Sequence, residues 1–348
     1  MQEGDSVDEY FRSYEELNVH HLMLDDNPRT FAYRKAIFEW REKFKNKVVM
    51  DVGAGTGILS IFCAQAGAKK VYAVEASKLA ILAKEVVIEN NFENVVQVIH
   101  NKVEDLDANV IEKVDILVSE WMGFYLVHEG MLNSVIVARD RYLKPEGFMF
   151  PSIAKLYAAP CQLPSFFDFW NNVYGVSMKC VGKKYRETKP LKPEVLTVKP
   201  QDLLSEGKLI AWLDLKEVSD EDLSHLGGNE WVFPCTKDGN YQGACIWFVV
   251  EFPNGSELPT SPMDEETHWK QTVIVLPSTI DVKKGEAIAF KMFLHHDLVN
   301  SRRYNIEFIM LDPADAEHDI PCSCNMPKCI VTRAYIQEHV NNPPISRV

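Results

Sequence analysis

Short apolar runs alternate with segments of helical spacing between residues 48 and 151. The apolar runs are rich in valine and isoleucine and cover residues 48–52, 71–74, 95–99 and 114–118. The segments with helical spacing cover residues 58–66, 77–90 and 131–143. Near-continuous apolar strands that alternate with helices predict a parallel, doubly wound α/β sheet, and such sheets bind their ligand beyond the carboxyl ends of the strands.

Residues 5–45 have the pattern of helices, with a turn at residues 25–29 that ends one helix and begins the next. Tyr10, Phe11, Tyr14 and Leu17 share one face at helical spacing. Core packing is the ordinary explanation of such a stripe. The alternative is a lid, because a helix outside the sheet must bury this face against something, such as a bound cofactor.

After residue 151 the pattern changes to that of a predominantly β half. A strand is predicted at 152–160, an aromatic and helical segment at 162–186, and a stretch punctuated by proline at 187–206. Alternating positions then predict strands at 209–215, 244–252, 272–276, 287–294 and 304–310. We expect a sandwich or barrel here. The chain would then divide into N-terminal helices (1–46), an α/β domain (47–151) and a β half (152–348).

Charge and composition narrow the possible partners and the compartment. The formal net charge is −13, which argues against direct nucleic-acid binding and suits a cationic partner. No apolar run approaches the ~20 residues that span a bilayer, and the acidic N-terminus lacks the apolar core of a signal peptide. We therefore expect no membrane association and an intracellular protein, nuclear or cytoplasmic, whose eight cysteines are reduced.

A glycine-rich turn follows the first predicted strand, with an acid in front of it. Asp51 precedes Gly53, Gly55 and Gly57, and a second acid, Glu75, ends the next strand. Glycines let a ligand approach the backbone, and an acid at the second strand end typically accepts hydrogen bonds from a ribose. Nicotinamide and S-adenosylmethionine enzymes both use such a turn. Asp51 would repel a pyrophosphate but suits the cationic methyl donor, so we favour S-adenosylmethionine.

Two glutamates, Glu120 and Glu129, flank a short loop that contains Trp121, Met122 and Gly123. If the loop folds back as a hairpin, both carboxylates face one pocket, where they would repel each other unless a cation lay between them. A planar guanidinium that makes bidentate bonds is the natural cation. The alternative is a solvated acid at a strand end and a second acid in the first turn of a helix, where the dipole favours it.

Three widely separated segments together resemble the motifs of the protein arginine N-methyltransferases. They are VVMDVGAGTGILSIFCAQAGAKKVYAVEAS (48–77), SEWMGFYLVHEGML (119–132) and THWKQ (267–271). Residues 9–14 and 20–30 are also similar to the type I branch of this family, which makes asymmetric dimethylarginine. The resemblance covers roughly residues 8–310, and only a few residues precede it, so we expect a core-only member without the extra modules that some members carry.

The family resemblance implies a fold and a quaternary structure. It predicts a Rossmann-like domain that binds S-adenosyl-L-methionine, followed by a β-barrel domain. A helical dimerisation arm is inserted in the barrel of this family and corresponds to residues 162–186. We therefore expect a homodimer.

The resemblance also implies roles for individual residues. The cofactor site would consist of Tyr10, Phe11, Tyr14, His20, Arg29, Asp51, Gly53, Gly55, Glu75 and Glu104. The three aromatic residues would form the helix that closes over the cofactor, which replaces core packing as the explanation of the stripe. Arg29 would pair with the methionine carboxylate of the cofactor, and Glu75 would bind its ribose.

The substrate side of the site follows from the same resemblance. Glu120 and Glu129 would clamp the substrate guanidinium, and His268 would lie beside it with Asp26 as its partner. The proton would leave through Glu129 or through His268 and Asp26. The acceptor pocket would be shaped by Met23, Met131 and Trp269.

The expected reaction is methyl transfer to arginine in proteins such as histones or RNA-binding proteins, giving monomethylarginine and asymmetric dimethylarginine. A catalytically silent scaffold or co-regulator with the same fold is the alternative from a different functional class. A small-molecule methyltransferase is disfavoured, because it would share the glycine turn but not the paired glutamates or the Thr-His-Trp segment.

The C-terminus, from about residue 312, departs from the family pattern. It contains His318, Cys322, Cys324 and Cys329. A zinc site with these four ligands is conceivable, but Cys-x-Cys is tighter than the usual spacing of two to four residues between zinc-binding cysteines. We therefore expect a thiol-bearing surface tail and no metal.

Overall fold

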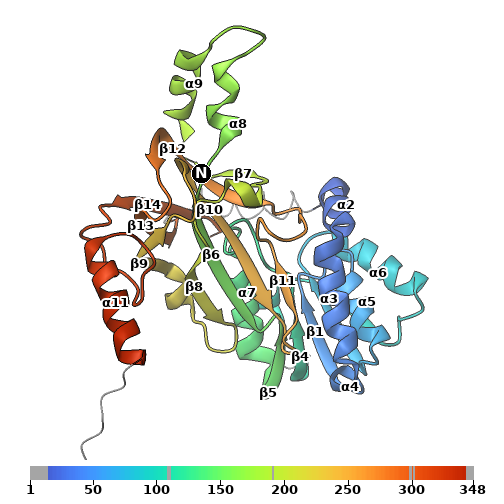
Figure 1. Ribbon diagram of the computed structural model, residues 1–348. Coiled ribbons are helices and arrows are strands. Elements are labelled where there is room, and N and C mark those ends of the chain that lie inside the picture. Colours follow the sequence, from blue (N-terminus) through green and yellow to red (C-terminus); the bar gives the residue numbers. More distant parts are fainter. Residues whose placement is uncertain (1–14, 108–110, 190–191, 298–299, 301, 342–348) are drawn as a thin grey trace, which may run out of the picture.

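The computed structural model describes residues 15–107, 111–189, 192–297, 300 and 302–341. N-terminal helices and a parallel α/β sheet form one side of the molecule, and antiparallel sheets form the other (Figure 1). A helical arm projects from the antiparallel half, and the C-terminal helix lies at the side farthest from the α/β sheet (Figure 1). No helix that the structure describes is both long enough and apolar enough to cross a membrane.

The parallel sheet has five strands in the order β3-β2-β1-β4-β5, as expected of a doubly wound sheet. Its strands are β1 (Val48–Val52), β2 (Lys70–Glu75), β3 (Val96–His100), β4 (Val114–Val118) and β5 (Leu143–Phe150). The helices that connect them are α5 (Ile58–Gln65), α6 (Leu79–Glu89) and α7 (Met131–Tyr142), with a 3₁₀ turn η1 (Val103–Asp105) after β3. The four predicted strands and three predicted helices are confirmed; β5 was not predicted.

Every residue of β1 is buried, which explains its uninterrupted apolar pattern. Asp51 is the one polar residue of this strand, and its carboxylate is also fully buried. The carboxyl ends of β1, β2 and β4 lie side by side in the sheet. The acids and glycines that follow these strands are therefore brought to one edge.

Within the described residues, three helices precede the sheet: α2 (Leu17–Asp25), α3 (Asn27–Glu39) and α4 (Arg41–Phe44). The predicted turn between the first two is confirmed, because Asp26 caps α3 by accepting a hydrogen bond from the backbone N–H of Arg29. Pro28 in the first turn favours the same start. Tyr10, Phe11 and Tyr14 lie outside the described residues, so the lid stays a prediction.

The second half is antiparallel. One sheet has six strands, with β7-β12-β10-β6-β8 in order and β11 paired to β10, and a second sheet has the order β14-β13-β9. The strands are β6 (Ile153–Cys161), β7 (Glu194–Leu196), β8 (Lys208–Asp214), β9 (His225–Pro234), β10 (Gly239–Glu251), β11 (Glu257–Pro259), β12 (Gln271–Val282), β13 (Ala287–His296) and β14 (Tyr304–Leu311). The helix α10 (Asp220–Ser224) and the 3₁₀ turn η4 (Pro200–Asp202) lie in the connections. Among the described residues the hydrogen bonds form two sheets and no closed ring.

The six strands predicted in this half are confirmed, but β7, β9 and β11 were not predicted. β9 was missed because Gly227 and Gly228 interrupt its alternation of apolar and polar residues. Both adopt positive φ angles, 88° and 92°, so the strand passes through a conformation that its pattern does not reveal.

The arm contains α8 (Pro164–Phe167), the 3₁₀ turn η2 (Phe169–Asn171) and α9 (Lys179–Arg186), joined by a tight turn at Tyr174 and Gly175. Figure 1 shows it standing out from the antiparallel half. The prediction of a helical segment here is confirmed, although the helices are short.

The expectation of a thiol-bearing surface tail is wrong. Residues 327–341 form a helix, α11 (Pro327–Asn341), and Cys322, Cys324 and Cys329 are buried in a small cluster at its N-terminal end. The physical reason is that the loop before α11 docks against the turn between β12 and β13, where Asn325 donates its backbone N–H to the carbonyl of Gly285 (2.7 Å).

Candidate active site

A cavity of about 370 Å³ opens at the carboxyl ends of the parallel strands. Most of the residues expected at the site line its wall. They are His20, Met23, Arg29, Gly53, Gly55, Glu75, Glu104, Glu120, Glu129, Met131, His268 and Trp269. The N-terminal helices, the α/β sheet and the β half each contribute, so the expected residues, which lie up to 249 positions apart in the sequence (from His20 to Trp269), meet in one cavity.

The glycine turn forms one wall of the cavity. Gly53, Gly55 and Gly57 all have positive φ angles (72°, 54° and 86°), which explains why glycine stands at each position. A Cβ atom on Gly53 would lie 2.1 Å from Cε of Met131. The absence of a side chain at Gly53 therefore lets Met131 pack directly against the turn.

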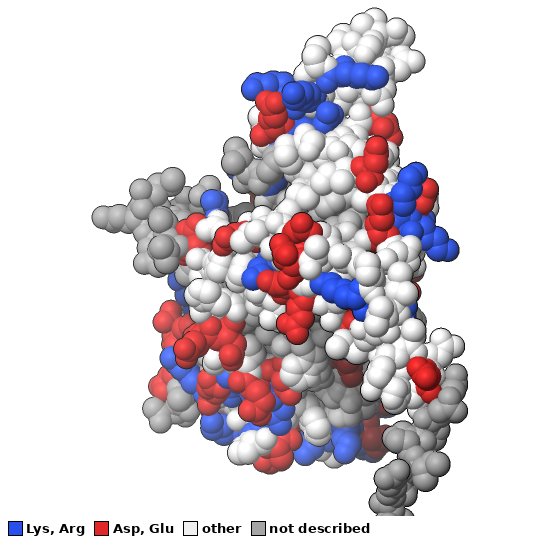
Figure 2. Space-filling view, turned by 60° about the vertical axis from the view of Figure 1, so that its left-hand side comes forward, with Lys and Arg blue, Asp and Glu red and all other residues white. Residues whose placement is uncertain are grey.

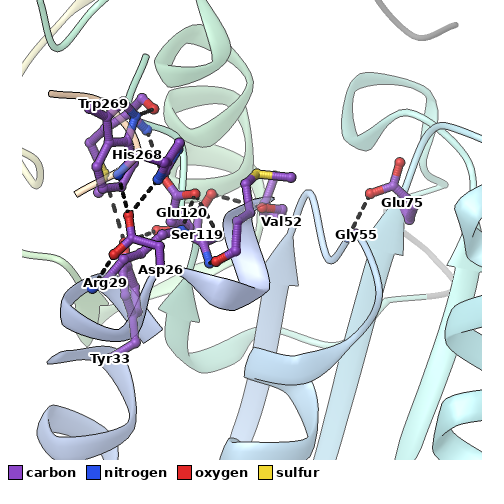
Figure 3. A network of polar contacts seen from close by, with 12 residues as sticks. Asp26, Arg29, Tyr33, Val52, Gly55, Glu75, Ser119, Glu120, His268 and Trp269 are labelled. Atoms are coloured by element: carbon purple, nitrogen blue, oxygen red, sulfur yellow. Dashed lines mark hydrogen bonds and ion pairs between the residues drawn. The ribbon is translucent and has the colours of Figure 1, made fainter. Parts of the chain in front are cut away.

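Glu75 is held beside this turn by two backbone donors. The N–H of Gly55 donates to Oε2 (2.8 Å) and the N–H of Ser77 donates to Oε1 (2.7 Å). Figure 3 shows Glu75 next to Gly55 and apart from the cluster around Glu120. A carboxylate oriented in this way has further lone pairs free to accept hydrogen bonds from a ligand hydroxyl.

Glu104 lies beyond the next strand, and its Oε1 accepts a hydrogen bond from Ser134 Oγ of α7 (2.6 Å). Glu75 is the last residue of β2 and Glu104 follows β3, and these are neighbouring strands of the sheet. Two carboxylates from neighbouring strands thus line the cavity, as the strand ends predicted. The carboxylate oxygens on this wall accept hydrogen bonds, so they fit the hydroxyl and amine groups of S-adenosylmethionine.

Asp51 is the one described cofactor residue from the sequence analysis that does not line the cavity. Its Oδ2 accepts a hydrogen bond from Ser60 Oγ of α5 (2.6 Å), so the carboxylate turns toward the helix. Its other oxygen, Oδ1, is buried without a hydrogen-bond partner among the described residues. Burial raises the pKa of Asp51 to about 7, opposed by the Ser60 hydrogen bond and reinforced by the charge of Glu75.

A buried ion pair joins Arg29 of α3 to Glu120 at the end of β4. Nε and Nη2 of Arg29 both donate to Oε2 of Glu120, at 2.9 Å and 2.7 Å. Burial lowers the pKa of Arg29, but the charge and hydrogen bonds of Glu120 outweigh this effect and raise it above its ordinary value. Arg29 therefore stays charged, and in this structure it bonds one of the two glutamates expected to clamp a substrate.

A second pair joins Asp26 to His268. Oδ2 of Asp26 lies 2.6 Å from Nδ1 of His268 and also accepts the backbone N–H of His268 (2.8 Å). Burial raises the pKa of Asp26, but the hydrogen bonds from His268 and Arg29 hold it below its usual range. Figure 3 shows the Asp26–His268 pair close to Arg29 and Glu120. Asp26 itself does not line the cavity, so it orients His268 from behind.

Trp269 follows His268 and anchors this segment to the loop after β4. Its Nε1 donates to the carbonyl of Met122 (2.9 Å), and its ring lies 4.0 Å from that of His268, measured between centroids. Met23 lies on α2, and its carbonyl accepts a hydrogen bond from Nη1 of Arg29 (3.0 Å). Met23, Met131 and Trp269 thus all reach the same cavity.

The loop between the two glutamates folds back on itself, which is the condition under which both carboxylates were expected to face one pocket. Gly123 and Leu126 form an isolated antiparallel bridge. A Cβ on Gly123 would lie 2.1 Å from the carbonyl oxygen of His128, so only glycine fits. Glu129 lies outside the first turn of α7, which begins at Met131, and it has a φ angle of 81°. The alternative of a helix-capping acid is therefore wrong.

Several lining residues were not predicted: Asn101, Lys102, Trp121, Phe124, Ser134 and Arg302. Asn101 and Lys102 directly follow β3, so the rule that ligands bind at strand ends could have identified them. Ser134 and Arg302 carry no such signal, because they reach the cavity through the packing of α7 and the loop before β14.

The strand order, the glycine turn and the acid after β2 define a Rossmann-like methyltransferase domain joined to an antiparallel domain. Two family models agree with this class. Residues 36–139 match the model described as ribosomal protein L11 methyltransferase (PrmA), and residues 152–310 match the arginine methyltransferase oligomerization subdomain.

Sequence comparison then identifies the family. The chain is 43% identical to protein arginine N-methyltransferase 6 of Danio rerio over 305 residues, which cover 84% of this chain and 86% of the relative. It is 42% identical to the protein of that name from Xenopus tropicalis over 307 residues, which cover 86% and 89%. The chain therefore belongs to the protein arginine N-methyltransferase family, which confirms the resemblance of its motifs.

Solved structures agree with this assignment. The fold is similar to the Trypanosoma brucei PRMT1 enzyme–prozyme heterotetrameric complex with AdoHcy, with a TM-score of 0.77, 33% identity, and coverage of 88% of this chain and 98% of that one. It is also similar to the crystal structure of PRMT6-SAH, with a TM-score of 0.74, 34% identity, and coverage of 85% and 100%. The protein is an arginine methyltransferase, and its cofactor is S-adenosylmethionine.

Gly53→Ala is expected to weaken the binding of S-adenosylhomocysteine by roughly tenfold or more. The added Cβ would collide with Met131, which lines the cavity, and would force that side chain to move. Gly255→Ala is the matched control, because Gly255 also has a positive φ angle (80°) but an added Cβ would meet no atom within 4 Å. Isothermal titration calorimetry on both variants measures the difference. Unchanged affinity in Gly53→Ala would contradict a cofactor site at this turn.

The raised pKa of Asp51 predicts a pH-dependent stability. Between the ordinary carboxyl value of 3.8 and about 7, the native state binds more protons than the unfolded state, so the free energy of unfolding falls as the pH rises through this window. By about pH 8 the loss is on the order of a few kcal/mol. Urea unfolding at about pH 5 and about pH 8 should therefore show a smaller pH effect in Asp51→Asn than in the unmodified protein. If the free energy of unfolding changed with pH by the same amount in both proteins, the raised pKa of Asp51 would be disproved.

Proposed function

We propose that this protein is a type I arginine methyltransferase, which transfers methyl groups to a terminal guanidino nitrogen of arginine in proteins and forms monomethylarginine and asymmetric dimethylarginine. One observation carries the proposal. A single cavity is lined by the glycine turn and Glu75 on one side and by Glu120, Glu129 and His268 on the other. A methyl-donor site and a cation site would therefore share one cavity.

The residues at the first side fit S-adenosylmethionine. Glu75 and Glu104 offer carboxylate oxygens to hydroxyl and amine groups, and the glycine turn, which carries no side chains at Gly53 and Gly55, would let the cofactor approach the backbone. His20 lies against this turn, with its ring 3.6 Å from the position of a Cβ on Gly55. Arg29 is proposed to bind the cofactor carboxylate in addition to Glu120. When bound, the cofactor supplies an electrophilic methyl group on its sulfonium.

On the second side, Glu120 and Glu129 are proposed to hold the substrate guanidinium. In this structure Arg29 forms an ion pair with Glu120, one of these two carboxylates. Guanidinium is a poor nucleophile because its lone pairs are delocalised and its pKa exceeds ~12. Two carboxylates orient it and draw its positive charge away from the reacting nitrogen, and they stabilise the charge that the guanidinium gains in the transition state.

His268 is proposed to receive the proton that the guanidinium loses. Its Nδ1 is hydrogen-bonded to Asp26, which fixes the ring and favours the tautomer with hydrogen on Nδ1. Nε2 is then the ring nitrogen that can accept a proton. The low pKa of Asp26 keeps its carboxylate charged, so the carboxylate would stabilise the imidazolium.

Met23 and Met131 are proposed to shape the acceptor pocket, with Trp269 as its rigid wall. Methionine side chains are flexible and adapt to guests of different size. Such a pocket would admit a guanidino nitrogen that already carries one methyl group, which asymmetric dimethylation requires.

The decisive experiment transfers labelled methyl from S-adenosylmethionine to a histone mixture and to a peptide rich in arginine and glycine, followed by total hydrolysis and separation of the amino acids. Asymmetric dimethylarginine is expected. Monomethylarginine alone would disprove the type I assignment. Binding of the cofactor without labelling of either substrate or of a broader panel would instead support the scaffold alternative.

Glu129→Gln is expected to lower methylation by about 10²-fold or more, because it removes the charge that balances the substrate guanidinium. Binding of S-adenosylhomocysteine should persist, since the glycine turn and Glu75 are untouched. Glu93→Gln, at an exposed position outside the cavity, is the matched control. Retained turnover in Glu129→Gln would exclude the clamp.

The helical arm is proposed to mediate homodimerisation. Phe169, Tyr174 and Val176 are 56%, 102% and 53% exposed, so the arm presents apolar side chains at its tip. Figure 2 shows this tip in white, with Lys and Arg side chains lower on the arm. A second exposed apolar group lies on α6, at Ile81 and Ile88. In a two-fold dimer the arm of each subunit would cover α6 of the other. The apolar side chains of the arm tip and of α6 would then be buried in two equivalent contacts. The matched oligomerization subdomain supports this assembly.

Negative charge introduced at the tip of the arm should abolish the dimer. Tyr174→Asp combined with Val176→Asp is expected to shift the protein from dimer to monomer in sedimentation velocity at micromolar concentration, because a desolvated carboxylate is costly in an apolar interface. Leu209→Asp, at an exposed apolar position on β8, serves as the control. A doubly substituted protein that still sediments as a dimer would assign the interface elsewhere.

Substrates rich in arginine, such as histones and RNA-binding proteins, fit the proposal because the chain carries a net charge of −13. The cysteines that the structure describes are all free thiols, which suits a reducing compartment. We therefore propose an intracellular location, in the nucleus or the cytoplasm.

A further inference from the structure

Four side chains that can bind metal converge near the N-terminal end of α11. They are His318, Cys322, Cys324 and Cys329, and their ligand atoms all lie within 4.8 Å of one another. Cys324 is fully buried and the other two thiols nearly so, while His318 is half-buried. None of the four lines the catalytic cavity. The matched oligomerization subdomain ends at residue 310, so this cluster lies beyond it.

The distances between the four ligand atoms are close to those of a tetrahedral zinc site. Tetrahedral zinc with thiolate and imidazole ligands requires about 3.8 Å between two sulfurs and about 3.5 Å between sulfur and nitrogen. Nδ1 of His318 lies 3.5 Å from Sγ of Cys324 and 3.1 Å from Sγ of Cys329. The ligand atoms therefore need to move by no more than about 1 Å to surround an ion.

The imidazole of His318 is oriented as a metal ligand. Its Nε2 lies 2.7 Å from the carbonyl oxygen of Pro313. A carbonyl only accepts hydrogen bonds, so Nε2 carries the hydrogen and Nδ1 presents its lone pair to the sulfurs. Histidines that bind metal commonly donate their second ring N–H to a carbonyl or carboxylate in this way.

The loop that carries the thiols is braced independently of any ion. The guanidinium of Arg333 donates to the carbonyls of Cys322 and Cys324, the latter at 2.8 Å. Lys328 donates to the carbonyls of Ala314 and Ala316, at 2.8 Å and 3.1 Å. These bonds hold the segment before α11 in the conformation that brings the four ligands together. The short Cys-x-Cys spacing is therefore compensated, because Cys329 and His318 close the site from the helix and from the preceding loop.

We propose that His318, Cys322, Cys324 and Cys329 bind one structural zinc ion that fastens α11 to the β half. Zinc fills a closed site of four protein ligands and needs no water. On binding, the three thiols release their protons to solvent and become thiolates, so zinc and its ligands together carry a charge of −1. The guanidinium of Arg333, next to the loop, offsets that charge.

A disulfide is the competing use of these thiols. It would join two of the three cysteines and leave the third thiol and the oriented imidazole without a function. Zinc uses all four groups. The cysteines of the described residues are free, which is the state that zinc binding requires.

The test is the metal content of the full-length protein, produced without a histidine tag and purified without chelators. Mass spectrometry with an inductively coupled plasma should find about one zinc per chain. Replacement of zinc by Co²⁺ should produce the intense visible bands of tetrahedral cobalt and the near-ultraviolet charge-transfer bands of thiolate ligation.

Cys324→Ser and His318→Ala should each lower the zinc content strongly, with loss of the cobalt bands. Cys180→Ser is the matched control, since Cys180 is an exposed thiol on the arm and should not affect either signal. Binding of S-adenosylhomocysteine should survive in all three variants, which also verifies that they fold.

Two results would overturn the proposal. The first is wild-type protein with fully reduced cysteines that contains no zinc and takes up neither Zn²⁺ nor Co²⁺. The second is a disulfide among Cys322, Cys324 and Cys329 in protein whose thiols were trapped at lysis. Because the measurement on wild-type protein needs no substitution and no methylation assay, it is independent of the proposed function.

Discussion

The start of α3 connects all three parts of this chain. The carboxylate of Asp26 caps the helix through the N–H of Arg29 and binds both the backbone and the ring of His268 from the β half. The side chain of Arg29 in turn binds Glu120 at the end of β4. Breaking a buried, hydrogen-bonded ion pair by removing one partner typically costs 3–5 kcal/mol. The geometry of the cavity therefore depends on one turn of helix.

Local pattern predicted the local structure. The period of buried parallel strands and amphipathic helices predicted four of the five strands and all three connecting helices of the α/β sheet, and it missed β5. The pattern failed where the backbone itself is unusual. In β9, Gly227 and Gly228 break the alternation, and α11 follows a cysteine-rich loop that offers no period at all.

The site was predictable to a different extent. The acids after β2 and β4 follow from the rule for strand ends, but the pairing of Asp26 with His268 spans 242 residues and has no signal in spacing or composition. That pair was predicted only from the family resemblance. For Asp51 the sequence predicted the position but not the direction of the side chain. Its position was identified, but whether a carboxylate faces a cavity or a helix depends on its rotamer, and Ser60 decides that here.

Because Asp26 serves as helix cap and histidine partner at once, its rotamer is fixed by the backbone of α3. A side chain in this position cannot rotate without releasing an N–H of the first helical turn. Fraying of that turn would consequently free the imidazole of His268, because Asp26 holds both its ring and its backbone. A substitution that only loosens the helix start would then resemble the loss of a catalytic group, although it changes no atom of the cavity wall.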